Sequence, residues 1–171
     1  MLENSKSIYF IKKLFTFVDE KIKLDIIKYN KNMQNIMDIN LINYKFYSKK
    51  YIEYEENGKG KEYNGYDNKL EFEGGYLNGK RNGKGKEYDW KGKLSFEGEY
   101  SNGKRNGQGK EYDWNGKVKF EGEYLNGNRN AKGKEYDWNG KLKFEGEYLN
   151  GKRNGKGKEY YKDGRLKFEG E

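Results

Sequence analysis

Hydrophobic and polar residues follow two different rhythms along this chain. In residues 1–50 the apolar residues recur at intervals of three and four, which is the period of one helix face. From residue 51 onward apolar and charged residues alternate, which is the period of a strand. The pattern therefore predicts an α-helical N-terminal segment over residues 1–50 and a β-rich region over residues 51–171.

The helical segment divides into short pieces. The first apolar stripe is formed by Ile8, Ile11, Leu14, Phe15 and Val18. Ser5 or Ser7 can cap this helix, and residues 19–20 mark a turn and a new helix start. A second stripe contains Ile22, Leu24, Ile26, Ile27 and Tyr29, and a third short helix holds Ile36 and Met37. Helices this short bury little surface alone, so we expect them to dock on each other and to cap the sheet or bind a partner.

One phenylalanine recurs every 24 residues through the β-rich region. The five positions are Phe72, Phe96, Phe120, Phe144 and Phe168. Each is followed by Glu-Gly, and a shorter, degenerate unit begins at Tyr51. A fixed period of this length indicates a tandem repeat. Each unit contains two apolar runs separated by turn residues, which is typical of a β-hairpin. We expect about eleven strands in one elongated antiparallel layer.

The short turn of each hairpin can be assigned from its register. A three-residue loop over residues 114–116 pairs Tyr112 with Val118 and places Tyr112 on the same face as Phe120. A two-residue loop would move Tyr112 to the charged face. Three-residue loops end in a left-handed residue, and Gly116 suits that position. We therefore expect the three-residue loop and a single aromatic face.

Two glycine positions carry further predictions. The glycine after Phe-Glu lies on the apolar face, where it either leaves room for an aromatic ring or marks a bulge. In the long turn, Ala131 replaces a glycine that the other full units keep. Alanine at a position that requires positive φ would cost about 1 kcal/mol, so we interpret this position as tolerant of a side chain.

Composition restricts the classes of function. The 171 residues are 32% hydrophobic, 37% charged and 17% aromatic, so an ordered core must be built mainly from Tyr, Phe and Trp. The chain has neither Cys nor His, which removes disulfides, thiol and imidazole nucleophiles and the usual zinc ligands. No apolar run is long enough for a membrane span or a secretion signal. We predict no catalytic residue, cofactor or metal site, and an intracellular location.

Basic residues gather on the long turns. The chain carries a net charge of +8 from 36 basic and 28 acidic residues. The candidates for binding acidic lipid or another acidic partner are Lys80, Arg81, Lys84, Lys104, Arg105, Arg129, Lys132, Lys152, Arg153 and Lys156. Stacked hairpins would align them in a ridge along one sheet edge. The alternative is a solvated edge without a ligand. Acids on the same strands oppose nucleic acid binding.

Tryptophans and the last strand are the candidates for protein binding. Trp90, Trp114 and Trp138 recur in the short turns, where they either form an exposed ladder or fold over the neighbouring hairpin. Lys162 replaces tryptophan in the last unit. The sequence stops at the start of another unit, which predicts an open edge strand that pairs a homodimer, or a fragment of a longer chain. We also expect the aromatic face of a single-layer sheet to be half covered and open to a partner.

The repeat resembles the MORN (membrane occupation and recognition nexus) family. Its pattern is close to YEGEWxNGKRxGxG, and residues 96–109 read FEGEYSNGKRNGQG. The chain differs in the leading Phe, in Tyr for Trp and in a slightly longer unit, as in variant MORN repeats. The resemblance implies a twisted single layer of hairpins in a non-enzymatic scaffold that binds proteins, dimerises or places partners at membranes.

A weaker resemblance concerns the N-terminal segment. Residues 13–19, KLFTFVD, are similar to the start of an F-box, a helical module that docks ubiquitin-ligase adaptors. Three functions are therefore open. The first is a cytoplasmic protein-binding scaffold, the second is attachment to acidic phospholipids through the basic ridge, and the third is an F-box-like adaptor. A location at a membrane surface or the cytoskeleton is compatible with the first two.

Overall fold

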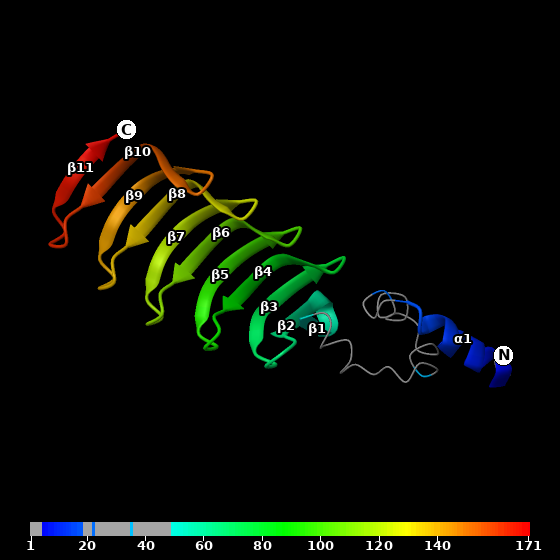
Figure 1. Cartoon of the computed structure of the whole chain (residues 1–171). Helices are drawn as coiled ribbons and strands as arrows, with labels where there is room; N and C mark the ends of the chain where they lie inside the picture. The colour runs from blue at the N-terminus through cyan, green and yellow to red at the C-terminus, as the bar shows by residue number, and fades with distance from the viewer. Residues whose placement is uncertain (1–4, 19–21, 23–34, 36–48) are drawn as a thin grey trace. The chain divides into compact units, whose positions relative to one another are not determined.

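The computed structural model describes residues 5–18, 22, 35 and 49–171. The chain separates into two units, of which one contains Met1–Tyr51 with Asn64–Asn68 and the other contains Ile52–Tyr63 with Lys69–Glu171. The first unit includes helix α1, and the second includes nearly all of the sheet (Figure 1).

Helix α1 spans Ser5–Phe15, close to the first predicted helix. Its last turn carries Lys12 and Lys13, the placement that the helix dipole favours. After the helix, Thr16 Oγ1 donates a hydrogen bond to the Lys13 carbonyl at 2.7 Å. The predicted second and third helices lie almost entirely outside the described residues.

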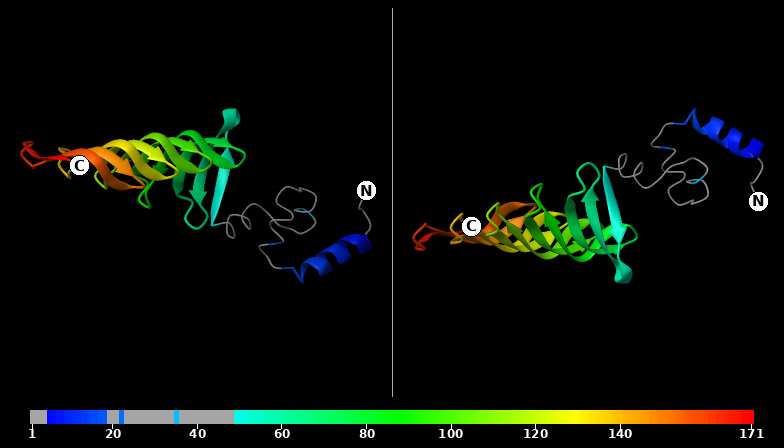
Figure 2. Two further views of the ribbon diagram at one scale, coloured as in Figure 1. Left: turned by 90° about the horizontal axis from the view of Figure 1, so that it is seen from above. Right: turned by 90° about the horizontal axis from the view of Figure 1, so that it is seen from below.

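Eleven strands form one antiparallel sheet in which every strand pairs with its neighbours in sequence. A short 3₁₀ turn, Glu56–Gly58, connects the first two. The strands are β1 (Lys50–Tyr54), β2 (Lys59–Asn64), β3 (Leu70–Leu77), β4 (Lys80–Tyr88), β5 (Leu94–Ser101), β6 (Lys104–Tyr112), β7 (Val118–Leu125), β8 (Asn128–Tyr136), β9 (Leu142–Leu149), β10 (Lys152–Tyr160) and β11 (Leu166–Gly170). This confirms the predicted single layer of hairpins, which twists along its length (Figure 2).

Two kinds of turn alternate along the sheet. At one edge, Asn-Gly pairs such as Asn102–Gly103 connect strands whose flanking residues pair directly, Ser101 with Lys104. Both turn residues have positive φ, 50° and 84°, as a two-residue type I′ hairpin requires. The opposite edge carries the three-residue loops, which run along the lower side of the sheet in Figure 1.

The three-residue loop is confirmed, but the face predicted for Tyr112 is wrong. Tyr112 pairs with Val118, and Gly116 has a φ of 81°. However, the preceding residue Glu111 pairs with Phe120. The step from Glu111 to Tyr112 in β6 therefore corresponds to a step of two residues in β7, which is a β-bulge. This bulge places Glu111 on the face of Phe120 and turns Tyr112 to the opposite face. Only unbroken alternation on both sides of the turn would have kept Tyr112 on the face of Phe120.

The interpretation of Ala131 as an unstrained position is also wrong. Its φ is 53°, in the same left-handed region as Gly83, Gly107 and Gly155 of the other units. These residues do not lie in the Asn-Gly turns but inside β8, β4, β6 and β10, and Ala131 lies where the register between β7 and β8 shifts. At this irregularity the alanine adopts a conformation that a glycine would take without strain.

Candidate functional site

A ladder of aromatic rings runs along one face of the sheet. Phe96 is fully buried and Tyr100 is nearly so. The Phe96 ring meets Tyr100 of its own strand edge-on at 5.7 Å and Tyr124 of the next hairpin at 5.1 Å. The same pattern continues from Phe72 to Tyr148, and these rings form the core of the sheet.

Glycines make room for this ladder. A Cβ on Gly98 would lie 2.8 Å from Phe96 Cζ, and one on Gly109, across the strand pair, would lie 2.5 Å from the same atom. The ring therefore lies over two glycine backbones. This confirms that the repeated glycine provides space, while the register irregularity between Gly98 and Tyr100 shows that a bulge lies beside it.

Arginines cover the rings. The Arg105 guanidinium carbon lies 3.9 Å from the Phe96 ring centroid, and Arg129 lies 4.1 Å from that of Phe120. Arg81 and Arg153 stack on Phe72 and Phe144 in the same way. A guanidinium stacks well on an aromatic face because it is planar and weakly hydrated.

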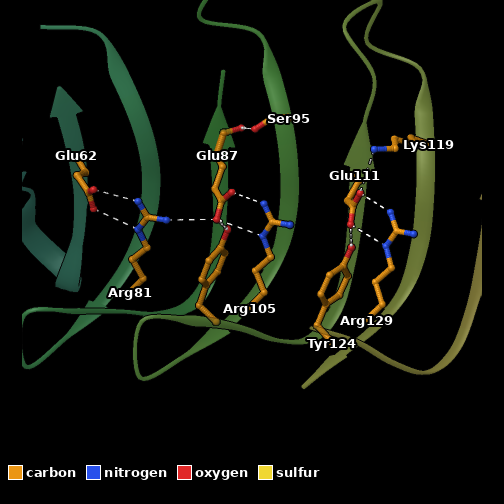
Figure 3. A network of polar contacts seen from close by, with 10 residues as sticks. Glu62, Arg81, Glu87, Ser95, Arg105, Glu111, Lys119, Tyr124 and Arg129 are labelled. Carbon is orange, nitrogen blue, oxygen red and sulfur yellow. Dashed lines mark hydrogen bonds and ion pairs between the residues drawn. The ribbon is translucent and has the colours of Figure 1, made fainter. Parts of the chain in front are cut away.

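Each arginine is held by glutamates from the same face (Figure 3). Arg129 Nε and Nη2 donate to Glu111 at 3.0 and 2.6 Å, and Tyr124 Oη donates to the same carboxylate at 2.8 Å. Arg105 binds Glu87 in the same way. Arg129 Nη1 also reaches Glu135 at 3.5 Å, so the ion pairs link neighbouring repeats.

These contacts shift the ionisation of both partners. Burial alone would raise the pKa of the Glu111 carboxyl, but hydrogen bonds from Arg129 and Tyr124 outweigh it, and the net pKa is lowered. The pKa of Glu87 and of Glu135 is lowered by the same balance. Burial and the neighbouring carboxylate raise the pKa of Tyr124 well above its ordinary value. The network is therefore held in one charge state near neutral pH.

The sequence-based expectation that the aromatic face is half covered is wrong. Phe72, Phe96 and Phe120 have no exposed surface because the Arg–Glu–Tyr layer closes over them. Sequence reasoning missed Glu62, Glu87, Glu111 and Glu135 because it assigned the second run of each hairpin to the wrong face. A usable signal was the spacing: for Glu87, Glu111 and Glu135 the Tyr follows the glutamate by 13 residues and the Arg follows it by 18, and for Glu62 the two intervals are 14 and 19.

The opposite face forms a groove of about 1410 Å³, which is lined mainly by lysine, glutamate and glycine residues. Charges alternate across its strands, as in Lys86, Glu97, Lys110, Glu121 and Lys134. Tyr112 Oη donates to Glu97 at 2.6 Å, and burial together with this contact raises the pKa of Tyr112 to about 12. The mixed signs of the lining give the groove little net charge.

The predicted basic residues do not gather into one ridge. The four arginines, Arg81, Arg105, Arg129 and Arg153, are engaged with glutamates on the aromatic face. Lys84, Lys132 and Lys156 line the groove on the other face. Lys80, Lys104 and Lys152 lie exposed beside the Asn-Gly turns. Only this last group forms a row at the sheet edge, and whether any of them binds lipid stays a prediction.

The three tryptophans form an exposed row on the three-residue loops. Trp90, Trp114 and Trp138 are 73%, 75% and 69% exposed. Neighbouring loops are linked, because Lys93 Nζ donates to the Trp114 carbonyl at 2.8 Å and Lys117 Nζ donates to that of Trp138 at 3.3 Å. The sequence left two alternatives, an exposed row of tryptophans or tryptophans folded over the neighbouring hairpin, and the exposed row is the arrangement observed. Its role in protein binding stays a prediction.

Each tryptophan loop is fixed by its own hydrogen bonds. Asp113 Oδ1 accepts from the backbone N–H groups of Asn115 and Lys117 at 2.8 and 2.9 Å. The Gly116 N–H donates to the Asp113 carbonyl at 2.9 Å. The loops of Trp90 and Trp138 repeat this pattern. The tryptophan backbones are therefore held in place before any partner binds.

Other predicted features are only partly described. The F-box-like segment begins in the last turn of α1, and its final residue lies outside the described residues. In β11, Leu166 and Phe168 are about half exposed, and dimerisation through this strand stays a prediction. Within the described part of the chain, no three carboxylates are grouped to hold a metal ion. No described helix is long and apolar enough to cross a membrane.

Comparison with known proteins agrees with the repeat architecture. The family model of the MORN repeat matches residues 72–89, 96–117, 120–141 and 144–164. No curated protein matches the chain.

Solved structures are similar only at a distance. A structure of TarM aligns at 10% identity and a TM-score of 0.42, covering 79% of this chain and 26% of TarM. A variant of S. aureus TarM, in complex with fondaparinux, alpha-GlcNAc-glycerol and UDP, aligns at 11% identity and a TM-score of 0.42, covering 79% and 27%. A GtfA/B complex bound to UDP and GlcNAc gives a TM-score of 0.29 at 11% identity, covering 70% and 24%. The chain thus spans about a quarter of these proteins.

Proposed function

The chain belongs to the MORN-repeat family, and from this premise we propose that it is a non-enzymatic scaffold that binds other proteins through the tryptophan row of its sheet. MORN repeats are generally scaffolds without catalytic activity. The row consists of Trp90, Trp114 and Trp138, and it repeats with the hairpins that carry it.

One observation supports this proposal above the others. Three large aromatic side chains are about 70% or more exposed on loops whose backbones are already ordered. Tryptophan is the residue type most enriched at binding hot spots, and an ordered backbone lowers the entropy lost on binding. From β3 to β10 the aromatic face offers no such surface, since Phe72, Phe96, Phe120 and Phe144 are buried beneath arginines.

Affinity capture from the source cells tests the proposal. The bait is the full chain, compared with a variant in which all three tryptophans are replaced by alanine. We expect a defined set of proteins to be retained by the unchanged chain and lost with the variant, because each hot-spot tryptophan contributes about 2 kcal/mol or more.

A second variant controls for loss of the fold or of general charge. Lys80, Lys104 and Lys152 are exposed at the other sheet edge, and their replacement by Ser leaves the tryptophan row intact. This variant should retain the same proteins. If the tryptophan variant captures the same set as the unchanged chain, the row is not the binding surface.

Peripheral membrane attachment is a second candidate function, because these three lysines form an exposed row along the Asn-Gly turns. Each basic residue near an acidic lipid surface contributes about 1 kcal/mol. If the protein attaches to membranes in this way, we expect the full chain to sediment with acidic but not with neutral vesicles at low salt. Replacing the three lysines by Glu should abolish sedimentation, while replacing Lys91 and Lys93 on the opposite edge should not. Equal sedimentation of both variants would rule out this function.

A further inference from the structure

We propose that the tryptophan row is a docking site for a proline-rich segment of a partner protein, bound as a polyproline II helix with proline or another apolar residue at every third position and acidic residues between. This inference rests on the proposed function and names the chemistry of the partner.

The spacing of the row favours this conformation. Each hairpin adds two strands, so equivalent points on successive tryptophan loops are separated by about 9.6 Å. One turn of polyproline II contains three residues and rises about 9.3 Å, so positions i, i+3 and i+6 lie on one side at nearly the same interval. Residues i, i+3 and i+6 of the ligand can therefore contact Trp90, Trp114 and Trp138, one residue to each tryptophan.

Other backbone conformations fit less well. In a β-strand three residues also extend about 10 Å, but alternate side chains point to opposite faces, so every third residue cannot face one row. In an α-helix seven residues rise about 10.5 Å, and the register slips by about 1 Å at each step. Polyproline II also has free backbone carbonyls that an indole N–H can reach.

The charges of the loop edge indicate acidic residues in the ligand. Residues 89–95, 113–119, 137–143 and 161–167 contain nine basic and four acidic side chains. Lys119 and Lys167 pair with Glu111 and Glu159 outside these segments, which leaves a net charge of +3. The aspartates at the starts of the three tryptophan loops each accept hydrogen bonds from the backbone of their own loop. Lys91 lies over the Trp90 ring, 4.7 Å from its centroid. A ligand carboxylate beside an apolar position would therefore meet a lysine.

The proposed occupant is a different protein, because the 171 residues contain no proline from which a proline-rich ligand could be formed. A polyproline II segment is also a low-entropy ligand, since proline fixes its own backbone angle, which suits an exposed surface with little depth.

Intrinsic fluorescence reports directly on the site, because the three tryptophans of the row are the only ones in the chain. The probe is a synthetic nine-residue peptide without tryptophan or tyrosine, with proline at every third position and Glu and Ala between. The control peptide has the same composition in an order that breaks the period of three. A third peptide is helical, with leucine at every seventh position and the same number of glutamates.

For the full chain we expect saturable changes in emission with the periodic peptide and binding at least about tenfold weaker with the control. Trp114→Ala, at the centre of the row, should weaken binding by about tenfold or more, judged by anisotropy of a labelled peptide. Tyr161→Ala, an exposed aromatic beside the row, is the matched control and should leave the affinity unchanged.

Extending the row gives a sharper test. Lys162 occupies the position that tryptophan holds in the three preceding loops. Lys162→Trp should bind a twelve-residue periodic peptide about tenfold more tightly than the unchanged chain does. The nine-residue peptide, which already spans three tryptophans, should change much less.

Two results would overturn the inference. One is equal binding of the periodic and scrambled peptides, and the other is binding of the helical peptide in preference to both. If the periodic peptide fails but the triple tryptophan variant still loses its captured proteins, the ligand chemistry is wrong and the scaffold function stands. If the captured proteins are also unaffected, the row is not a binding site of either kind.

Discussion

At the scale of single residues, one position of the repeat has a backbone conformation that favours glycine. Gly83, Gly107 and Gly155 have positive φ inside β4, β6 and β10. Ala131 takes the same conformation, with a φ of 53°, where the register between β7 and β8 shifts. Substitution of Ala131 therefore measures the free-energy cost of a positive φ at a residue other than glycine.

Replacing this alanine should stabilise the protein. We expect Ala131→Gly to raise the free energy of unfolding by about 0.5–1 kcal/mol, because the strain at positive φ exceeds the entropy that glycine loses on folding. The measurement is the urea midpoint. Gly83→Ala, the reverse change at the equivalent position of β4, where an added Cβ would meet no atom within 4 Å, should lower stability by a similar amount. A neutral or destabilising Ala131→Gly would contradict the assignment of strain.

At the scale of the hairpin, an ion pair substitutes for a second layer of structure. A single sheet normally needs another sheet or helices to cover its apolar face. Here, Arg129 lies on Phe120 and is fixed by Glu111, and the tyrosine hydroxyl completes the arrangement. Arg129, Phe120, Tyr124 and Glu111 come from three adjacent strands. Each repeat therefore supplies the side chains that cover its own apolar face.

The geometry predicts that lysine cannot replace this arginine. Arg129→Lys should cost about 2 kcal/mol, because lysine loses both the paired hydrogen bonds to Glu111 and the stacking on Phe120. Arg165→Lys provides the matched control, since Arg165 pairs with Asp163 while 81% of its side chain is exposed. That change should cost only a few tenths of a kcal/mol. Equal losses in urea denaturation would show that the network is no stronger than a surface pair.

At the scale of the whole molecule, the repeated network makes stability depend on pH in two regions. The lowered pKa of Glu87, Glu111 and Glu135 means that their stabilisation is complete above the unfolded value of about 4.3 and is lost as the pH falls. The pKa of Tyr88, Tyr112 and Tyr136 is raised to about 12, so stability declines as the pH rises above about 10.

The urea midpoint should therefore be nearly constant from about pH 5 to 9 and should fall on both sides. Glu111→Gln should have a lower midpoint near neutrality and a shallower acid limb, because one of the depressed carboxyl groups is gone. An acid limb that is unchanged in this variant would assign the acid sensitivity to other carboxylates.

The amino-acid sequence by itself determined the 24-residue period, the hairpins, the three-residue loops and the glycines beneath the rings. These features follow from local alternation, turn chemistry and space, which neighbouring residues specify. The tertiary structure decided which side chains lie on which face of the sheet. One bulge beside each short turn, on the strand that follows it, places Glu111 on the aromatic face and Tyr112 on the other, and this brings residues 13 and 18 positions apart into one network. The arginines are consequently half-buried covers of the core, and the tryptophans are left as the exposed row, because a shift of one residue in a strand exchanges its two faces.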